Sequence, residues 1–192
     1  MRIINRLITK NNYMSYLEIG VGKPYKNFDR IRCRQKTAVD PYVKCKYRTK
    51  RLRKMLYAMT SDDFFKLIPK NKKFDLIFID GLHTEEQSTR DINNSLLHLS
   101  EKGIIVAHDV IDVANENCNN SEVWKSIAFL RMTRKDLFVC VVDGDRGIGI
   151  IKRGRQNLFE KEDKSQLTYE FLQTHKKKLL NLYTENKFFK EN

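Results

Sequence analysis

Short apolar runs alternate with amphipathic stretches along most of the chain. Five runs have the length and the Ile, Val, Leu and Phe content of buried strands, and each contains or ends on an acidic residue. These runs are SYLEIG, TAVD, MLYAMTSD, FDLIFID and GIIVAHD. Helical patterns lie between several of them. The sequence therefore predicts an α/β fold with a mostly parallel sheet that helices cover on both faces.

Two helix starts are marked by residues that cap helices. Thr84 and Gln87 have the spacing of a capping box, ahead of an apolar helix face that runs as far as Leu99. Ser121 is placed to cap a later helix that carries Trp124. Both helices follow strand-like runs, as the alternating α/β pattern requires.

The pattern changes towards the end of the chain. LFVCVVD (137–143) and GIGIIKR (147–153) are two strand-like runs joined by a short polar link, which predicts an antiparallel hairpin. From about residue 165, apolar residues recur with helical spacing, so an amphipathic helix and tail are expected over 165–192, packed on the domain or on a partner subunit. We expect one domain over 1–192, with 1–12 as an N-terminal extension.

The length of 192 residues suits one domain, and the apolar runs are too short to cross a membrane. Arg2, Arg6 and Lys10 interrupt the first ten residues, which leaves no signal-peptide core. The expectation is a cytoplasmic protein without a membrane span.

Much of the net charge of +13 lies in one segment. Thirteen basic residues lie between Lys23 and Lys54, and only Asp29 and Asp40 oppose them. Positive charge concentrated in one segment can attract an anionic partner. A basic surface that only contacts solvent would have the same composition.

The acidic residues of the five runs share a position. In an open parallel sheet, ligands bind beyond the carboxyl ends of the strands, so these acids should gather at one edge. Some acids at such places only cap the next helix. Capping explains Glu18 poorly, because Glu18 lies inside an apolar strand, where a charge needs a partner.

The first turn carries a cofactor pattern. Gly20 and Gly22 allow a tight turn and a close approach of a ligand to the backbone, and Asp40 follows at the end of the second strand, where a carboxylate can hold ribose hydroxyls. Tyr25, after Pro24, stands where a dinucleotide fingerprint wants a third small residue. A phosphate-free, cationic ligand fits acidic strand ends better, which favours S-adenosyl-L-methionine (SAM) over NAD.

The motifs LEIGVG, VDP, TSDDFF, FDLIFIDGLHTEEQ and GIIVAHDV resemble, in order, those of the class I SAM-dependent methyltransferases, most closely a group of small bacterial proteins with an IDGLH motif. The resemblance covers nearly the whole chain. It implies a Rossmann-like fold with a seven-stranded sheet whose last strand is antiparallel. It also implies a set of cofactor contacts at the strand ends. These are Glu18, Gly20 and Gly22 at the methionine portion, Asp40 at the ribose, Ser61 and Asp62 at the adenine, and Asp80 at the fourth strand end. Pro24 and the short span from Gly22 to Lys36 depart from the family pattern.

Two ways of activating a methyl acceptor suit the residues at the predicted edge of the sheet. His83 and His108 lie at the fourth and fifth strand ends and could act as a general base on a methyl acceptor, or simply bond nearby backbone. Alternatively, Asp80 and Asp109 could bind Mg²⁺, which would lower the pKa of an acceptor hydroxyl. Catechol and caffeoyl-CoA O-methyltransferases resemble the chain in having acids at these places, but they usually show Asp-Asn where this chain has His108-Asp109.

The sequence also narrows the chemical class of the methyl acceptor. The Asp/Asn-Pro-Pro-aromatic signature of DNA amino-methyltransferases and a Pro-Cys nucleophile are both absent. O-methylation of a sugar, glycan or other small hydroxylated acceptor, possibly anionic, is therefore expected. One alternative is an RNA methyltransferase or nucleic-acid-binding protein that uses the basic segment. Another is a non-catalytic SAM-binding protein.

Overall fold

The structure is a computed structural model of the chain and describes residues 2–47, 49–111, 121–159 and 167–192. It divides into two compact units. Unit 1 comprises Met1–Leu82 and Arg90–Val106, and unit 2 comprises His83–Thr89 and Ala107–Asn192. Each unit is described by itself.

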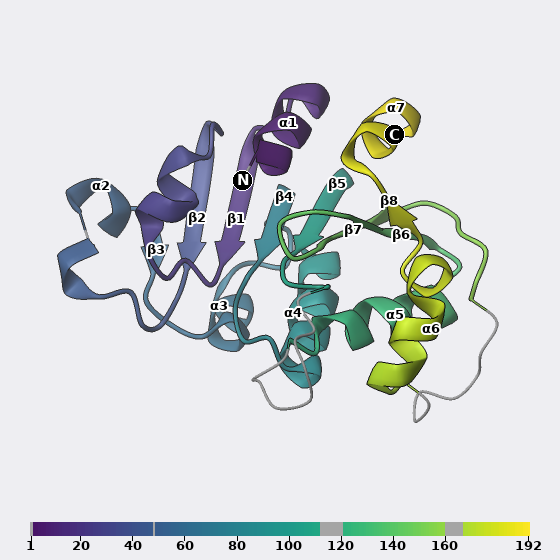
Figure 1. The fold of residues 1–192 in the computed structure, drawn as a ribbon. Coiled ribbons are helices and arrows are strands. Elements are labelled where there is room, and N and C mark those ends of the chain that lie inside the picture. Colours follow the sequence, from purple (N-terminus) through teal and green to yellow (C-terminus); the bar gives the residue numbers. More distant parts are fainter. Residues whose placement is uncertain (1, 48, 112–120, 160–166) are drawn as a thin grey trace. The chain divides into compact units, whose positions relative to one another are not determined.

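Unit 1 contains five strands and four of the five predicted acids, Glu18, Asp40, Asp62 and Asp80 (Figure 1). Its strands lie in the order β3-β2-β1-β4-β5, and β1 pairs in parallel with both β2 and β4. The strands are β1 (Ser15–Ile19), β2 (Gln35–Val39), β3 (Leu56–Tyr57), β4 (Phe74–Ile79) and β5 (Leu99–Ala107), whose last residue falls in unit 2. Since β1 has neighbours on both sides, most of its side chains are buried. The helix α1 (Arg2–Asn11) precedes β1 and buries four apolar residues.

The first crossover of unit 1 has no α-helix. Between β1 and β2 the chain makes two 3₁₀ turns, η1 (Pro24–Lys26) and η2 (Phe28–Arg30). Pro24 suits the first position of such a turn because its missing N–H would have no partner there. Phe28 is fully buried, so this short connection is still anchored to the core. After β2 come another 3₁₀ turn, η3 (Cys45–Tyr47), and the four-residue helix α2 (Lys50–Arg53).

Two longer helices follow. Thr60 caps α3 (Ser61–Leu67), because its Oγ1 accepts a hydrogen bond from the N–H of Asp63. The helix α4 (Glu85–Leu97) begins in unit 2 and continues in unit 1. The predicted cap is present, since Thr84 Oγ1 accepts from the N–H of Gln87 at 3.3 Å. The expectation that the helix extends to Leu99 is wrong: α4 ends at Leu97, and Leu99 begins β5.

Unit 2 contains the predicted hairpin. The strands β6 (Leu137–Val142) and β7 (Ile148–Arg153) pair antiparallel, with Val142 opposite Ile148. The tail is not one amphipathic helix, and its first residues, 165 and 166, lie outside the described ones. It forms α6 (Tyr169–Leu179), β8 (Leu182–Tyr183) and α7 (Glu185–Glu191). β8 pairs in parallel with β6, so the described residues form eight strands where seven were expected. The turn at residues 180–181 ends α6, and two apolar residues then continue as a strand.

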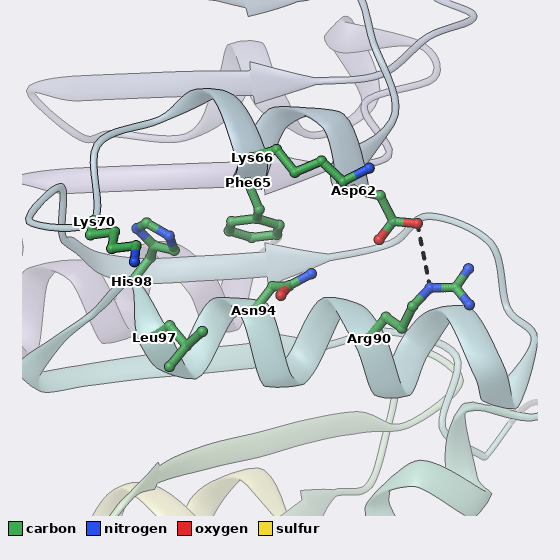
Figure 2. Close-up of a pocket in the computed structure, with 8 residues that line it drawn as sticks. All are labelled: Asp62, Phe65, Lys66, Lys70, Arg90, Asn94, Leu97 and His98. Carbon is green, nitrogen blue, oxygen red and sulfur yellow. Dashed lines mark ion pairs between the residues drawn. The ribbon is translucent and has the colours of Figure 1, made fainter.

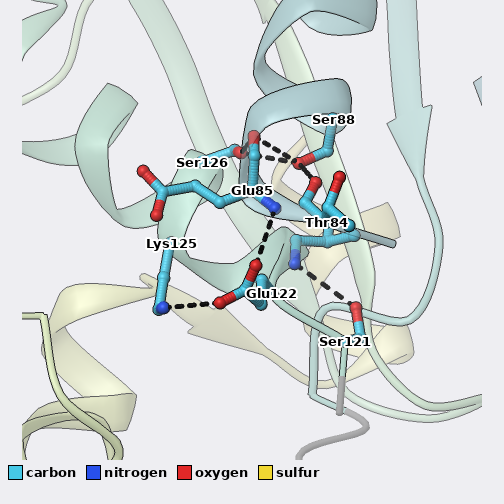
Figure 3. Close-up of polar contacts among 8 residues, drawn as sticks. Thr84, Glu85, Ser88, Ser121, Glu122, Lys125 and Ser126 are labelled. Atoms are coloured by element: carbon cyan, nitrogen blue, oxygen red, sulfur yellow. Dashed lines mark hydrogen bonds and ion pairs between the residues drawn. The ribbon is translucent and has the colours of Figure 1, made fainter. Parts of the chain in front are cut away.

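A buried polar cluster joins the starts of α4 and α5 (Val123–Thr133) within unit 2 (Figure 3). Ser126 Oγ lies 2.7 Å from Ser88 Oγ and 2.8 Å from Thr89 Oγ1, and it donates to the carbonyl of Glu85. Ser121 was expected to cap α5, but the N-cap residue is Glu122. Ser121 lies one residue earlier and accepts from the N–H of Val123.

None of the helices in the described part of the chain is long and apolar enough to cross a membrane.

Candidate functional site

The glycine turn of unit 1 is tied to the end of β2. Asp40 accepts the N–H of Gly22 on Oδ2 at 2.7 Å and the N–H of Tyr42 on Oδ1 at 2.6 Å. Gly22 has a φ of +51°, and a Cβ added there would meet no atom within 4 Å. The space beside Gly22 is therefore open, while Asp40 is largely buried and each of its oxygens has a further lone pair. This arrangement can receive two hydroxyls of a ribose.

Gly20 has a different reason to be glycine. Its φ is +85°, and a Cβ would lie 2.0 Å from the carbonyl oxygen of Asp80. The N–H of Asp80 donates to the carbonyl of Ile19 at 2.9 Å. The ends of β1 and β4 therefore meet in direct backbone contact, which only a residue without a side chain allows.

Glu18 has the partners that its place in a buried strand demands. The Tyr16 hydroxyl donates to Glu18 Oε2 at 2.5 Å, and the Asn27 amide donates to the same oxygen at 2.9 Å. Burial raises the pKa of the Glu18 carboxyl to about 8, and the nearby charge of Asp80 adds to this, while the hydrogen bonds from Tyr16 and Asn27 oppose it. Glu18 is thus a protonatable group inside the predicted cofactor site. Sequence reasoning found Glu18 but neither of its partners.

Ser61 and Asp62 begin α3, and Asp62 has a partner on α4. Arg90 Nε lies 3.4 Å from Asp62 Oδ2. Both residues line a cavity of about 760 Å³ between the two helices, together with Phe65 and Asn94 (Figure 2). The Asp62 carboxylate in Figure 2 is directed to Arg90, so an adenine at this place would meet a paired carboxylate. Nothing in the sequence pattern singled out Arg90.

In unit 2, one carboxylate lies between the two predicted histidines. His83 Nδ1 is 3.2 Å from Asp109 Oδ2, and His108 Nδ1 is 3.1 Å from Asp109 Oδ1. The Asp109 side chain is only 6% exposed, and its backbone is left-handed with a φ of 56°. Since an ionised carboxylate only accepts hydrogen bonds, a neutral His83 would carry its proton on Nδ1, the nitrogen that faces Asp109.

A hydrogen bond from the start of α5 holds the backbone of His83. The N–H of Glu122 donates to the carbonyl of His83 at 2.7 Å, and Glu122 Oε2 accepts from the N–H of Glu85. The polar cluster of Figure 3 therefore joins the start of α5 to the segment that carries His83.

The β6–β7 turn supplies two residues that sequence reasoning missed. Asp145 Oδ2 lies 3.7 Å from His108 Nε2, and Arg146 Nη1 lies 3.8 Å from Asp109 Oδ2. The turn is held against the Asp109 segment by backbone bonds, because the N–H groups of Val110 and Ile111 donate to the carbonyls of Gly147 and Arg146. The sequence showed only a short polar link between two strands.

The predicted residues thus fall into two groups. Glu18, Gly20, Gly22, Asp40, Ser61, Asp62 and Asp80 belong to unit 1, and His83, His108 and Asp109 belong to unit 2. Their roles stay predictions. The predicted Mg²⁺ pair of Asp80 and Asp109 takes one residue from each unit and also stays a prediction.

Comparison with known proteins identifies the fold. Residues 27–110 match the family model of a methyltransferase domain. No curated protein matches the sequence. Among solved structures, a candidate caffeoyl-CoA O-methyltransferase from Staphylococcus aureus has 20% identity and a TM-score of 0.61, covering 80% of this chain and 82% of the other.

Two more of these structures were solved with a cofactor or its product. An O-methyltransferase from Bacillus cereus in complex with S-adenosylhomocysteine (SAH) has 18% identity and a TM-score of 0.56, with 80% of each chain covered. TomG, an O-methyltransferase from Streptomyces achromogenes in complex with SAM, has 13% identity and a TM-score of 0.56, covering 79% of this chain and 78% of the other. At such identities the likeness shows the fold. The predicted Rossmann-like α/β class is confirmed, with eight strands instead of seven.

Proposed function

We propose that this methyltransferase domain transfers a methyl group from SAM to a hydroxyl of a small acceptor. The observation that carries the proposal is the turn of unit 1, in which the buried carboxylate of Asp40 borders the open space beside Gly22. This turn lies next to the segment that matches the family model. The cofactor-bound neighbours of the same fold support SAM as the ligand of this turn.

The residues of unit 1 suit this cofactor. Asp40 would accept from the ribose hydroxyls, and the backbone at Gly20 and Gly22 would border the methionine portion. Glu18 would face its cationic groups, and Ser61 with Asp62 the adenine. Bound SAM supplies an electrophilic methyl group on a sulfonium, which leaves as the neutral thioether of SAH.

The residues of unit 2 suit the other half of the reaction. The acceptor hydroxyl loses its proton as its oxygen bonds to the methyl carbon. Asp109 holds both imidazoles, and His108, whose side chain is partly exposed, is the histidine that would take that proton. Mg²⁺ on Asp80 and Asp109 is the alternative activation, and it would lower the pKa of the acceptor hydroxyl instead. A sugar or glycan hydroxyl is the proposed acceptor, attracted by the basic segment when it carries an anionic group.

Calorimetry with SAH tests the cofactor. Asp40→Ala should weaken SAH binding about ten- to a hundredfold, because a charge-assisted hydrogen bond contributes about 1.5–3 kcal/mol. Glu101→Ala removes an exposed carboxylate of the same unit and should leave the affinity unchanged. Tight binding of NAD without binding of SAM or SAH would refute the proposal.

Turnover assays with candidate sugars, with and without EDTA, test the chemistry. Asp80→Asn and Asp109→Asn should abolish methyl transfer while circular dichroism stays native. His108→Ala should lower the rate more than it lowers SAM affinity. Loss of activity with EDTA that Mg²⁺ restores selects the metal mechanism, and full activity in EDTA selects the histidine base. Full turnover in both Asp variants would show that the assigned residues are wrong.

A further inference from the structure

Two tyrosine rings of unit 1 meet next to the glycine turn. Tyr25 follows that turn within η1, and Tyr47 is the last residue of η3. Their ring centroids are 5.7 Å apart at an interplanar angle of 61°, so an edge-to-face contact joins the connections before and after β2. Tyr25 is nevertheless 46% exposed, which leaves much of its side chain available to a planar ligand.

Backbone hydrogen bonds hold both tyrosines in place. Around Tyr25, the N–H of Lys26 donates to the carbonyl of Lys23 at 2.9 Å. The N–H of Tyr47 donates to the carbonyl of Lys44, also at 2.9 Å. A tyrosine ring on a backbone fixed in this way can bind a planar partner at little cost in conformational entropy.

Lysines lie next to the ring pair. Lys23 and Lys26 stand on either side of Tyr25 in the chain, and both are exposed. Lys46 Nζ lies 5.1 Å from the centroid of the Tyr47 ring. The surface therefore combines aromatic rings with ammonium groups.

Acidic side chains offset little of this charge. Asp29 and Asp40 are the acids among the thirteen basic residues from 23 to 54. Asp40 is buried, and its two oxygens accept the N–H groups of Gly22 and Tyr42. An anion with more than one charge would therefore be attracted to the ring pair.

A nucleotide combines the two features that suit this surface, since its base stacks on an aromatic ring and its phosphates contact ammonium groups. Proteins that bind polynucleotides stack successive bases, whereas one ring pair offers a place for one base. We propose that this surface binds the nucleoside diphosphate part of the methyl acceptor, so that the acceptor is a hydroxylated molecule carried on a nucleotide. The proposal rests on the proposed function and names its substrate class. The binding residues are Tyr25, Tyr47, Lys23, Lys26 and Lys46.

The test is calorimetry of the whole chain with UDP and GDP, and with the parts uridine and pyrophosphate, each with and without saturating SAH. At least one of the two nucleoside diphosphates should bind at a single site. Uridine and pyrophosphate should each bind about tenfold more weakly, or less tightly still, because each keeps only part of the contacts. Saturating SAH should leave the nucleotide bound, which separates this surface from the cofactor site.

Variants divide the contacts between base and phosphates. Tyr25→Ser should weaken nucleotide binding about fivefold or more, while the affinities for pyrophosphate and SAH stay unchanged. Tyr25→Phe keeps the ring and should bind the nucleotide as wild type does. Lys23→Gln combined with Lys26→Gln should weaken nucleotide and pyrophosphate binding by similar factors. Tyr169→Ser removes a tyrosine of unit 2 that is 37% exposed and should change nothing.

Three results would overturn the proposal. The first is the absence of saturable binding of both UDP and GDP to wild type. The second is nucleotide binding that SAH displaces or that Tyr25→Ser leaves unchanged. The third is binding of an octauridylate at least about a hundredfold tighter than UDP with a steep salt dependence, which would make the surface a polynucleotide site. If the nucleotide binds and SAH does not, the proposed function fails and the nucleotide site stands.

Discussion

Single residues in this chain were predictable where their chemistry conflicts with their surroundings. Glu18 stands among apolar strand residues, and that conflict, together with the family resemblance, marked it as a candidate site residue. Its partners, Tyr16 and Asn27, were not predictable, because one is an ordinary strand residue and the other lies in an irregular connection. Arg90 and Arg146 escaped notice for the same reason: charged residues at exposed positions are common, and only the fold shows which carboxylate each one meets.

The raised pKa of Glu18 predicts how stability depends on pH. The folded state holds the proton up to about pH 8, whereas an unfolded glutamate releases it near its ordinary value of 4.5. Between these values the folded state binds more protons, so the free energy of unfolding falls as pH rises through this window. In Glu18→Gln, which stays neutral, this contribution should vanish. Urea unfolding of both proteins at pH 5, 7 and 9 measures it.

A ligand measurement accompanies that prediction. A cationic cofactor favours the ionised carboxylate, so SAM binding at pH 7 should release a proton from Glu18. Calorimetry in buffers of different ionisation enthalpy detects the release, which should be absent in Glu18→Gln. A variant whose stability keeps the wild-type slope between pH 5 and 9 would show that Glu18 is not the group that titrates.

Whole elements were predictable where their hydrophobic period was clear. The strands β1, β2, β4 and β5 and the β6–β7 hairpin follow from apolar runs of strand length. The tail was not predictable, since Leu179 and Tyr183 fit a helical period and yet lie on two sides of a turn. The first crossover, between β1 and β2, shows neither a strand period nor a helix period. This connection is short, and Pro24 favours a 3₁₀ turn over a longer helix.

The joint between α4 and α5 depends on Ser126. Its hydroxyl contacts Ser88, Thr89 and the carbonyl of Glu85, and Ser126 is buried. Ser126→Ala should lower the free energy of unfolding by about 1 kcal/mol, because Ser88 and Thr89 lose one hydrogen-bond partner while Ser88 keeps the carbonyls of Thr84 and Glu85. Thr133→Ala, in the same helix, removes an exposed hydroxyl that bonds only the carbonyl of Phe129. It should change stability by less than about 0.5 kcal/mol. Urea unfolding that shows equal losses in both variants would contradict this account of the joint.

At the scale of the whole chain, the sequence predicted the fold class but not its division into two units. The repeated pattern of an apolar strand followed by an acidic residue was enough to predict the fold class. A parallel α/β sheet repeats this same strand-then-helix pattern along the chain. The division cuts through β5 and α4, so no linker or change of composition marks it. The residues of the predicted site are accordingly shared between two units that the sequence presents as one.

The basic segment from Lys23 to Lys54 yields a prediction about the partner of the whole protein. Reversing Lys50, Arg51 and Arg53 to Glu changes three exposed side chains of α2. For a small anionic acceptor, the variant should show a raised KM with nearly unchanged SAM affinity, since few cations are needed to hold one phosphate. Reversing the exposed Lys177, Lys178 and Lys190 of unit 2 makes the same change in net charge and should leave KM unaltered.

A polynucleotide would contact many of these cations at once and release the counterions bound to its phosphates, so its affinity would fall steeply with salt. Gel shifts at two salt concentrations therefore decide between the partners: tight, strongly salt-dependent binding of RNA or DNA that only the first variant loses would replace the small acceptor with a nucleic acid.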